Sequence, residues 1–385
     1  MRARPRIDRL GTLLTVTGVA AVSLLPFVVF KSNRIMPGEA HSLFQALPAL
    51  WATGLCGLLV LVGAVAIAAR DARLRLIIAL AGLAAVAVAI ATAADLLTPA
   101  GNRIVRVSPG AGFWTVLLAV GLLSTDAIAR LRPGPGIRVV GLAAFAIVTA
   151  LAFHAGLFDH LSIMREYVGN ASRFARESRQ HVLLALGSLT AAVIVALPLG
   201  VFCHRVTRTR AAVLQVLNLI QTIPSIALFG ILMVPLGALA TAVPLAAELG
   251  IAGIGAAPAV IALFLYSLLP VVANTVVGLG RVPAATVEAA RGMGLTPTQV
   301  LRQVELPLAL PVILTGIRIV LVQNIGLVTI AALIGGGGFG TFVFQGMGQT
   351  AIDLVLLGAI PTVALAFSSA VVLDGLIDVM KKAPQ

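Results

Sequence analysis

Charged residues are scarce in this chain of 385 residues: Asp, Glu, Lys and Arg together make up 11% of it, whereas soluble proteins carry about 25%. Hydrophobic residues reach 59%, above the roughly 45–50% of soluble proteins. This composition excludes an ordinary soluble enzyme. It favours a membrane protein, in which each helical span needs about 20 predominantly apolar residues.

Lysine and cysteine are rare as well. The three lysines are Lys31, Lys381 and Lys382. None of them lies in a GxxxxGK[ST] loop, so the chain has no Walker A site and cannot hold ATP by that mechanism. Cys56 and Cys203 lie in apolar stretches and are too few for a disulfide framework or a metal cluster.

Motifs of catalytic and metal sites are missing from the sequence. It contains no HExxH, GxSxG or CxxC, and its five histidines are scattered without metal-ligand spacing. We therefore predict no catalytic residue, no metal site and no cofactor. With two Trp and two Tyr, the chain also offers few electron-rich rings for a ligand-binding aromatic cage.

Long apolar runs bounded by charge predict an all-α membrane protein with about ten transmembrane helices. The first run follows a cluster of arginines, but its length and the lack of an A-x-A-like cleavage site favour a span over a signal peptide. The expected spans are residues 11–30, 48–69, 76–95, 111–129, 138–158, 181–203, 211–236, 256–279, 308–334 and 354–378.

The net charge of +13 is explained by orientation. If both termini lie in the cytoplasm, 18 of the 27 Lys and Arg residues fall on the cytoplasmic side, 8 fall outside, and Arg318 lies within a span. This ratio satisfies the positive-inside rule, so a nucleic-acid surface is not needed to explain it. The basic cluster at residues 165–179 runs against the trend and is expected to form an external amphipathic helix.

The chain changes character near residue 180, which divides it into an accessory membrane domain at 1–179, a working domain at 180–378 and a tail at 379–385. Polar residues and prolines enter the spans of the second part, where they are costly unless they face a bundle interior or a wet cavity. Interhelical hydrogen bonding is the alternative for each amide, and a plain kink for Pro224. The translocation-path candidates are Asn218, Gln221, Pro224, Ser225, Asn274, Gln323 and Asn324.

A cytoplasmic segment of residues 281–307 separates the eighth and ninth spans. Residues 286–293 are expected to form a helix with Glu288 in its first turn, where a carboxylate suits the helix dipole. Gly294 follows at the position where a helix ends in the left-handed conformation. Thr296 is expected to cap a second helix that has Pro297 at its first position and stops before Pro307.

The same segment carries a spaced motif that resembles the EAA signature of permeases of ATP-binding cassette (ABC) importers. The family pattern is EAA, three residues, Gly, nine residues, Ile, one residue, Leu-Pro, and this chain departs from it in having Val for Ile. The resemblance implies that the segment is a coupling loop that docks on a separate ATPase subunit. The matching residues are Glu288, Ala289, Ala290, Gly294, Val304, Leu306 and Pro307.

Two further segments narrow the resemblance to a subfamily. The sequences QTIPSIAL at 221–228 and ALIGGGGFG at 332–340 look like segments of the glycine betaine/proline/choline (osmoprotectant) permeases. The likeness covers about residues 180–378. The five extra N-terminal spans are similar to the branch of this group that has a long N-terminal extension.

The resemblance implies the function and the partners of the chain. It implies a permease subunit in the bacterial inner membrane that imports a small osmoprotectant. The implied partners are a dimer of ATPase subunits, a second permease copy or a paralogue, an extracytoplasmic solute-binding protein and membrane lipid, with no nucleic acid.

Two alternatives stay open at this point. Gly335, Gly336, Gly337, Gly338 and Phe339 form either an outer gate or a flexible connection. The whole chain is either an ABC permease or an ion-coupled secondary transporter of a small zwitterion, which also uses broken helices. Against the second reading, Asp95, Asp126, Asp353 and Asp374 all lie near expected span ends instead of at mid-membrane.

Overall fold

A computed structural model describes residues 8–34, 36–102 and 104–382 and divides into two compact units. Unit 1 contains the described residues up to Ile137 together with Ala143–Gly169, and unit 2 contains Arg138–Leu142 and the described residues from Asn170 onward. Of the basic residues used above for orientation, Arg2, Arg4, Arg6 and Arg103 lie outside the described residues.

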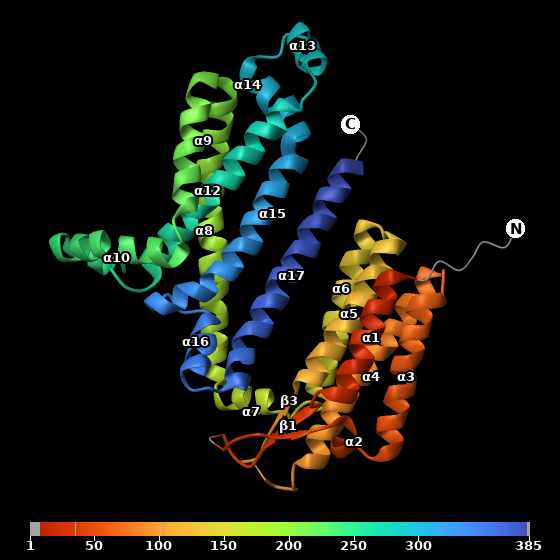
Figure 1. Cartoon of the computed structure of the whole chain (residues 1–385). Coiled ribbons are helices and arrows are strands. Elements are labelled where there is room, and N and C mark those ends of the chain that lie inside the picture. Colours follow the sequence, from red (N-terminus) through yellow and green to blue (C-terminus); the bar gives the residue numbers. More distant parts are fainter. Residues whose placement is uncertain (1–7, 35, 103, 383–385) are drawn as a thin grey trace, which may run out of the picture. The chain divides into compact units, whose positions relative to one another are not determined.

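Unit 1 is a bundle of helices with a small sheet at one end (Figure 1). Three short antiparallel strands pair in the order β2-β1-β3, with Val29 opposite Ala40 on one side and Ser108 on the other. The elements are α1 (Arg9–Leu24), β1 (Val28–Lys31), β2 (Glu39–His41), α2 (Leu43–Ala46), α3 (Ala49–Ala68), α4 (Ala72–Leu97), β3 (Arg106–Pro109), α5 (Ala111–Leu131), α6 (Pro135–His154) and α7 (Ser162–Gly169).

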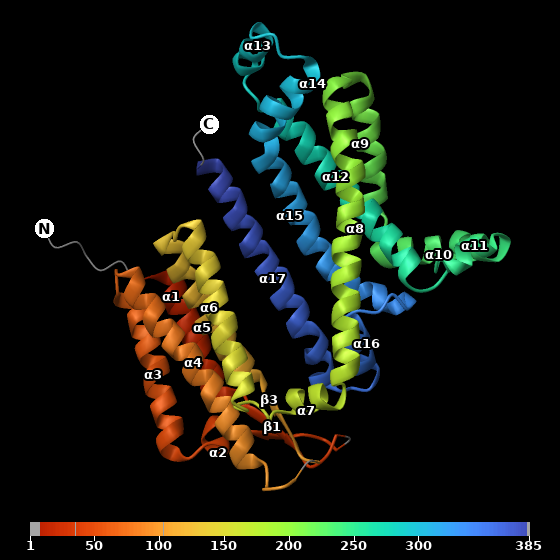
Figure 2. The same cartoon turned by 180° about the vertical axis from the view of Figure 1, so that it is seen from behind.

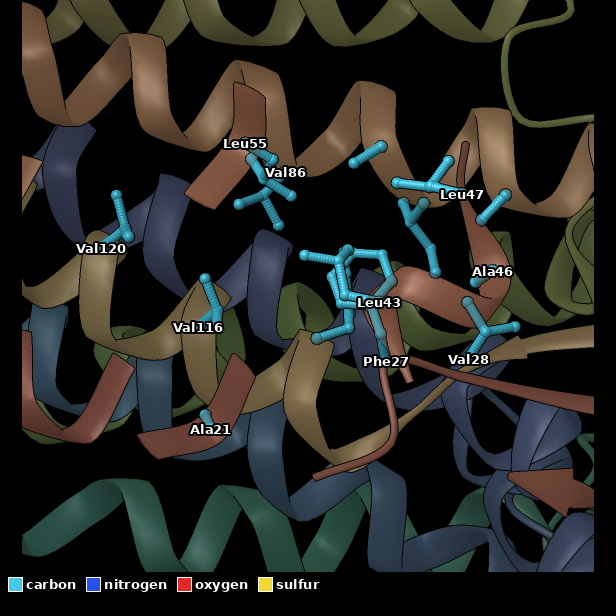
Figure 3. Close-up of a cluster of buried hydrophobic side chains, with 14 of the residues drawn as sticks. Ala21, Phe27, Val28, Leu43, Ala46, Leu47, Leu55, Val86, Val116 and Val120 are labelled. Carbon is cyan, nitrogen blue, oxygen red and sulfur yellow. The ribbon is translucent and has the colours of Figure 1, made fainter. Parts of the chain in front are cut away.

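The core of unit 1 lies between α1, α3, α4, α5 and the sheet. Figure 3 shows Leu43 beside Phe27, and the two side chains are almost fully buried. Phe27 meets Phe113 edge to face at 5.9 Å between ring centroids, a geometry that aromatic quadrupoles favour. Valines from α4 and α5 complete the cluster. This cluster is apolar, as the composition of this half predicts, and a few buried polar side chains such as Ser108 and Ser124 lie in the same unit.

Unit 2 is built around α12, which packs on both α8 and α15 (Figures 1 and 2). Small residues allow this close approach: a Cβ on Gly200 would lie 2.5 Å from Cβ of Thr275. The elements are α8 (Ala171–Arg205), α9 (Thr207–Thr222), α10 (Ser225–Ala242), α11 (Pro244–Glu248), α12 (Ala256–Gly280), α13 (Ala284–Gly292), α14 (Pro297–Val300), η1 (Leu301–Glu305), α15 (Leu306–Ala331), η2 (Ala332–Ile334), α16 (Gly340–Gly348) and α17 (Ile352–Lys382).

The described residues contain nine helices that are long and apolar enough to cross a membrane. Two of the ten expected spans are corrected. The run at 11–30 was predicted too long, since α1 ends at Leu24 and Val28–Lys31 is a strand. The run at 211–236 is two helices, because Pro224 has no backbone N–H and interrupts the chain between α9 and α10.

The change of character near residue 180 does not coincide with a helix boundary. α8 starts at Ala171 and passes unbroken through residues 179 and 180. The expected amphipathic helix at 165–179 is therefore divided between α7 and the first turns of α8.

Candidate coupling segment, gate and pathway residues

Residues 281–307, the candidate coupling segment, lie at the end of unit 2 opposite to α16 (Figure 1). The first helix of the segment, α13, ends in a Schellman motif, in which two backbone N–H groups bond back to the last turn. Gly294 N donates to Arg291 O at 2.9 Å, and Leu295 N donates to Ala290 O at 3.2 Å. Gly294 has φ +85°, so its predicted left-handed conformation is confirmed.

The second helix of the segment begins as predicted. Thr296 precedes α14, and Pro297 occupies its first position. The backbone N–H of Thr296 donates to Oε1 of Gln299 at 2.8 Å, and the N–H of Gln299 donates to Oγ1 of Thr296 at 3.4 Å. This is a capping box, which satisfies two otherwise orphaned donors at the helix start.

Two predictions about the segment are wrong. Glu288 is not in the first turn, because α13 begins at Ala284 and Glu288 is its fifth residue. The second helix does not stop before Pro307. α14 continues through the π-helical turn η1 into α15, because the wider turn carries the chain past a residue that has no N–H to donate.

The exposed and buried faces of the segment are clearly separated. Ala290 of α13 is 2% exposed and Val300 of α14 is 1% exposed. The two helices are therefore packed together on their buried sides. Glu288 and Ala289 are exposed, and Met293 is 74% exposed at the tip. Val304 and Leu306 are half-buried, and Pro307 is exposed. The segment thus presents a mixed apolar and charged surface above a buried apolar base.

Sequence reasoning missed a residue that fastens this base. Glu305 in η1 is 3% exposed, and its carboxylate pairs with the guanidinium of Arg205 at the C-terminal end of α8. A carboxylate directly before the apolar run at 306–314 was the available signal.

Polar groups at the break between α9 and α10 form hydrogen bonds with other protein groups. The hydroxyl of Tyr266 on α12 donates to the carbonyl of Ile223, and Nε2 of Gln221 donates to the carbonyl of Tyr266 at 2.7 Å. Freed backbone groups are tolerated at membrane depth only where they have such partners. Asn218 and Pro224 next to the break are exposed, and Ser225 is half-buried.

The other candidates for the translocation path differ in how deeply their side chains are buried. Asn324 is fully buried, and its Nδ2 donates to Oγ of Ser188 and Oγ of Ser267, both at 3.0 Å. These contacts join α15 to α8 and α12, so the structure places Asn324 inside the helix packing instead of on an open surface. Asn274 is half-buried and donates to Pro270 O of its own helix at 2.8 Å. Gln323 is half-buried.

Arg318 is paired within the bundle. It is the thirteenth of the 26 residues of α15, and its guanidinium bonds the carboxylate of Asp374 on α17. Among the described residues, no group of three or more His, Cys, Asp or Glu could hold a metal ion.

The glycine turn, Gly335–Gly338, lies between η2 and α16. Gly335, Gly337 and Gly338 have φ of +78°, +78° and +83°, a conformation that favours glycine. Phe339 and Phe342 do not project into an opening: they are 5% and 0% exposed and pack against Phe174 of α8.

The two halves of the chain match two different protein families. Residues 8–164 match the N-terminal domain of the ABC transporter permease YehY. Residues 192–383 match the family described as the binding-protein-dependent transport system inner membrane component.

Individual relatives resemble about half of the chain. The carnitine transport permease protein OpuCD of Listeria monocytogenes is 39% identical over 54% of this chain and 86% of its own length. The osmoprotectant import permease protein OsmW of Salmonella typhimurium is 44% identical over 54% and 90%. The glycine betaine/carnitine/choline permease protein OpuCD of Bacillus subtilis is 37% identical over 54% and 85%.

A solved structure of the inward-facing MetNI methionine ABC transporter matches 54% of this chain and 95% of its own chain, with 23% identity and a TM-score of 0.46. The sequence relatives, covered over most of their length, decide the assignment. The chain belongs to the binding-protein-dependent inner membrane component family, the permeases of ABC transporters.

Proposed function

We propose that the chain is the permease subunit of an importer for a small osmoprotectant such as glycine betaine, with proline, choline and carnitine as related candidates. The observation that carries this proposal is that relatives covered over most of their length are permeases named for osmoprotectant, carnitine and choline transport. The family assignment leaves the ion-coupled transporter without an observation in its favour.

Solute selection is assigned to a separate extracytoplasmic binding protein. An aromatic cage for a quaternary ammonium group needs several electron-rich rings, and the chain has two Trp and two Tyr. Tyr266 has its hydroxyl engaged at the α9–α10 break. The permease then needs only a weakly polar path, for which the half-buried or exposed Asn218, Gln221, Pro224, Ser225, Asn274 and Gln323 are the candidates.

The coupling segment is assigned to the ATPase partner. Its exposed residues Glu288, Ala289 and Met293 form the contact surface, and Gly294 fixes the angle between α13 and α14. Because α14, η1 and α15 are continuous, a movement of the docked segment is transmitted directly into α15. The Arg205–Glu305 pair transmits the same movement to α8.

The membrane arrangement follows from the charge distribution. We place both termini and the coupling segment in the cytoplasm of a bacterium, with 18 of 27 Lys and Arg on that side. The glycine turn then lies toward the outside, where it serves as the outer gate. Two copies of the coupling segment are required by a two-fold ATPase dimer, and they come from two copies of this chain or from a paralogue.

ATP-driven uptake tests this function. The chain is reconstituted in proteoliposomes with its ATPase and its binding protein, and uptake of labelled glycine betaine, carnitine, choline and proline is measured. We expect uptake that needs ATP inside the ATPase-containing compartment and the binding protein on the other side. Uptake by the chain alone down an ion gradient would contradict the proposal.

A further inference from the structure

The glycine turn is held by three side chains on one face of α8. Glu177, Gln180 and His181 are spaced i, i+3 and i+4, so they project from the same face of the helix. We call these three residues the α8 clasp. They lie toward the N-terminal end of α8, at the end of unit 2 away from α13 and α14 (Figure 2).

The three clasp side chains form hydrogen bonds with backbone groups at and next to the turn. The N–H of Gly338 donates to Oε2 of Glu177 at 2.8 Å, and the next N–H, that of Phe339, donates to Nδ1 of His181 at 3.2 Å. Nε2 of Gln180 donates to the carbonyl of Gly336 at 3.2 Å. The hydroxyl of Thr341 adds a longer bond, 3.4 Å, to Oε2 of Glu177.

The glycines permit this approach. A Cβ on Gly337 would lie 3.1 Å from Oε2 of Glu177, and a Cβ on Gly338 would lie 3.0 Å from Nδ1 of His181. The acceptors are shielded from water, since the Glu177 side chain is 12% exposed and His181 is 0% exposed. Bonds to a shielded carboxylate are strong, and a donor left without its acceptor there is costly.

We propose that the α8 clasp is the fixed half of the outer gate and that Glu177 and His181 are positioning residues that keep the glycine turn closed. This inference rests on the proposed function, in which the turn is the gate. Opening requires the N–H groups of Gly338 and Phe339 to leave their acceptors on α8. Weakening the clasp therefore favours the open state, whereas a clasp with a purely structural role would stay formed throughout transport.

A reversible disulfide across the clasp distinguishes these two roles. The distance between Cβ of Gln180 and a Cβ placed on Gly337 is 3.9 Å, within the range of about 3.5–4.5 Å for disulfides. The double variant Gln180→Cys/Gly337→Cys is made with Cys56→Ala and Cys203→Ala, and reconstituted with the ATPase and the binding protein. Each single cysteine serves as a control.

Oxidation of the double variant is expected to stop ATP-driven uptake, and a reducing thiol is expected to restore it, while the single variants do not respond. Equal uptake by the crosslinked and reduced forms would overturn the proposal. If the reduced double variant and the wild type both lack ATP-driven uptake, the proposed function itself has failed.

Loss of the carboxylate supplies a second, independent measurement. Glu177→Ala is expected to raise ATP hydrolysis in the absence of the binding protein by about fivefold, because the closed state loses a bond that the open state does not have. Glu177→Gln keeps an acceptor oxygen and should lie nearer the wild type. Arg179→Ala, on the exposed side of α8, is the matched control. Lowered hydrolysis in Glu177→Ala would contradict the gate role.

Discussion

Arg205 at the end of α8 and Glu305 in the π-helical turn form an ion pair that joins two helices at the base of the coupling segment. The Glu305 side chain is 5% exposed and that of Arg205 38%, so water screens the pair from one side. Its effect on stability is therefore modest, about 1 kcal/mol. Its effect on the transmission of movement is expected to be larger.

The Arg205–Glu305 pair gives the first prediction. Glu305→Ala should lower ATP-driven uptake more than it lowers ATP hydrolysis. The ATPase still docks on the coupling segment, but the movement of the segment is no longer transmitted to α8. The double variant Arg205→Ala/Glu305→Ala should be no worse than the single variant, since the two groups act together. Uptake and hydrolysis are measured on the same reconstituted complexes, and strictly additive losses would argue against coupling through the pair.

Gly294 gives the second prediction. Its φ of +85° costs a non-glycine residue about 1–2 kcal/mol, although no atom would lie within 4 Å of an added Cβ. Gly294→Val should leave the protein in the membrane but abolish transport. Gly294→Asn is the control, because Asn adopts this conformation more readily. Wild-type substrate-stimulated ATP hydrolysis in the Val variant would refute the prediction.

Reversing the charge at Glu288 is the third prediction. The side chain is exposed on α13, so Glu288→Lys should not unfold the chain. It should prevent the ATPase from docking and so abolish transport, as measured by co-purification of the two subunits. Gln303→Lys, an equally exposed position in η1, serves as the comparison. Normal co-purification of Glu288→Lys with the ATPase would remove this residue from the contact surface.

Asn324 gives the fourth prediction, which separates packing from pathway. Ser188 and Ser267 also donate to carbonyls of their own helices, so Asn324→Leu leaves no hydroxyl without a partner. The variant should lose about 1 kcal/mol or less of stability and keep the wild-type KM for uptake. A changed KM at unchanged melting temperature would instead place Asn324 on the path.

Asp8 gives a prediction about pH. Its carboxylate accepts bonds from Arg75 and Arg130, both at 2.6 Å, and Asp126 lies nearby. Burial raises the pKa of Asp8, but the hydrogen bonds from Arg75 and Gly11 and the two nearby guanidinium charges outweigh burial, so its pKa lies below the usual value. A lowered pKa in the folded state means that the stabilisation is present above the unfolded pKa, about 3.9, and is lost as the pH falls through the folded value.

We therefore expect acid to reduce the melting temperature of the wild type more steeply than that of Asp8→Asn. At neutral pH the variant should be less stable by about 1–3 kcal/mol. The measurement is thermal unfolding of the full chain in detergent between neutral pH and about pH 3. Parallel pH profiles for the two proteins would show that Asp8 does not contribute in this way.

The positions of many helices could be predicted because they depend on local properties. The span at 256–279 was expected from apolar length, and α12 covers Ala256–Gly280. The left-handed Gly294 and the cap at Thr296 were expected because both are properties of a few neighbouring residues. The end of the first span could not be read locally, because α1 gives way to a strand that pairs with two others, and the continuation through Pro307 depends on the π-helical turn before it. The errors at Pro224 and Glu288 were local, since the proline interrupts the chain between α9 and α10 and α13 begins two residues earlier than expected.

The sequence by itself determined that the chain lies in a membrane, and it determined the family resemblance and the coupling motif. Hydropathy, charge and spaced residues can be counted along the chain. Only the tertiary structure decided which polar groups meet. Asn324 donates to Ser188 and Ser267, Glu305 pairs with Arg205, and the N–H of Gly338 donates to Glu177. The physical reason is that a buried polar group is stable only beside a partner, and these partners are 57 to 161 residues away along the chain.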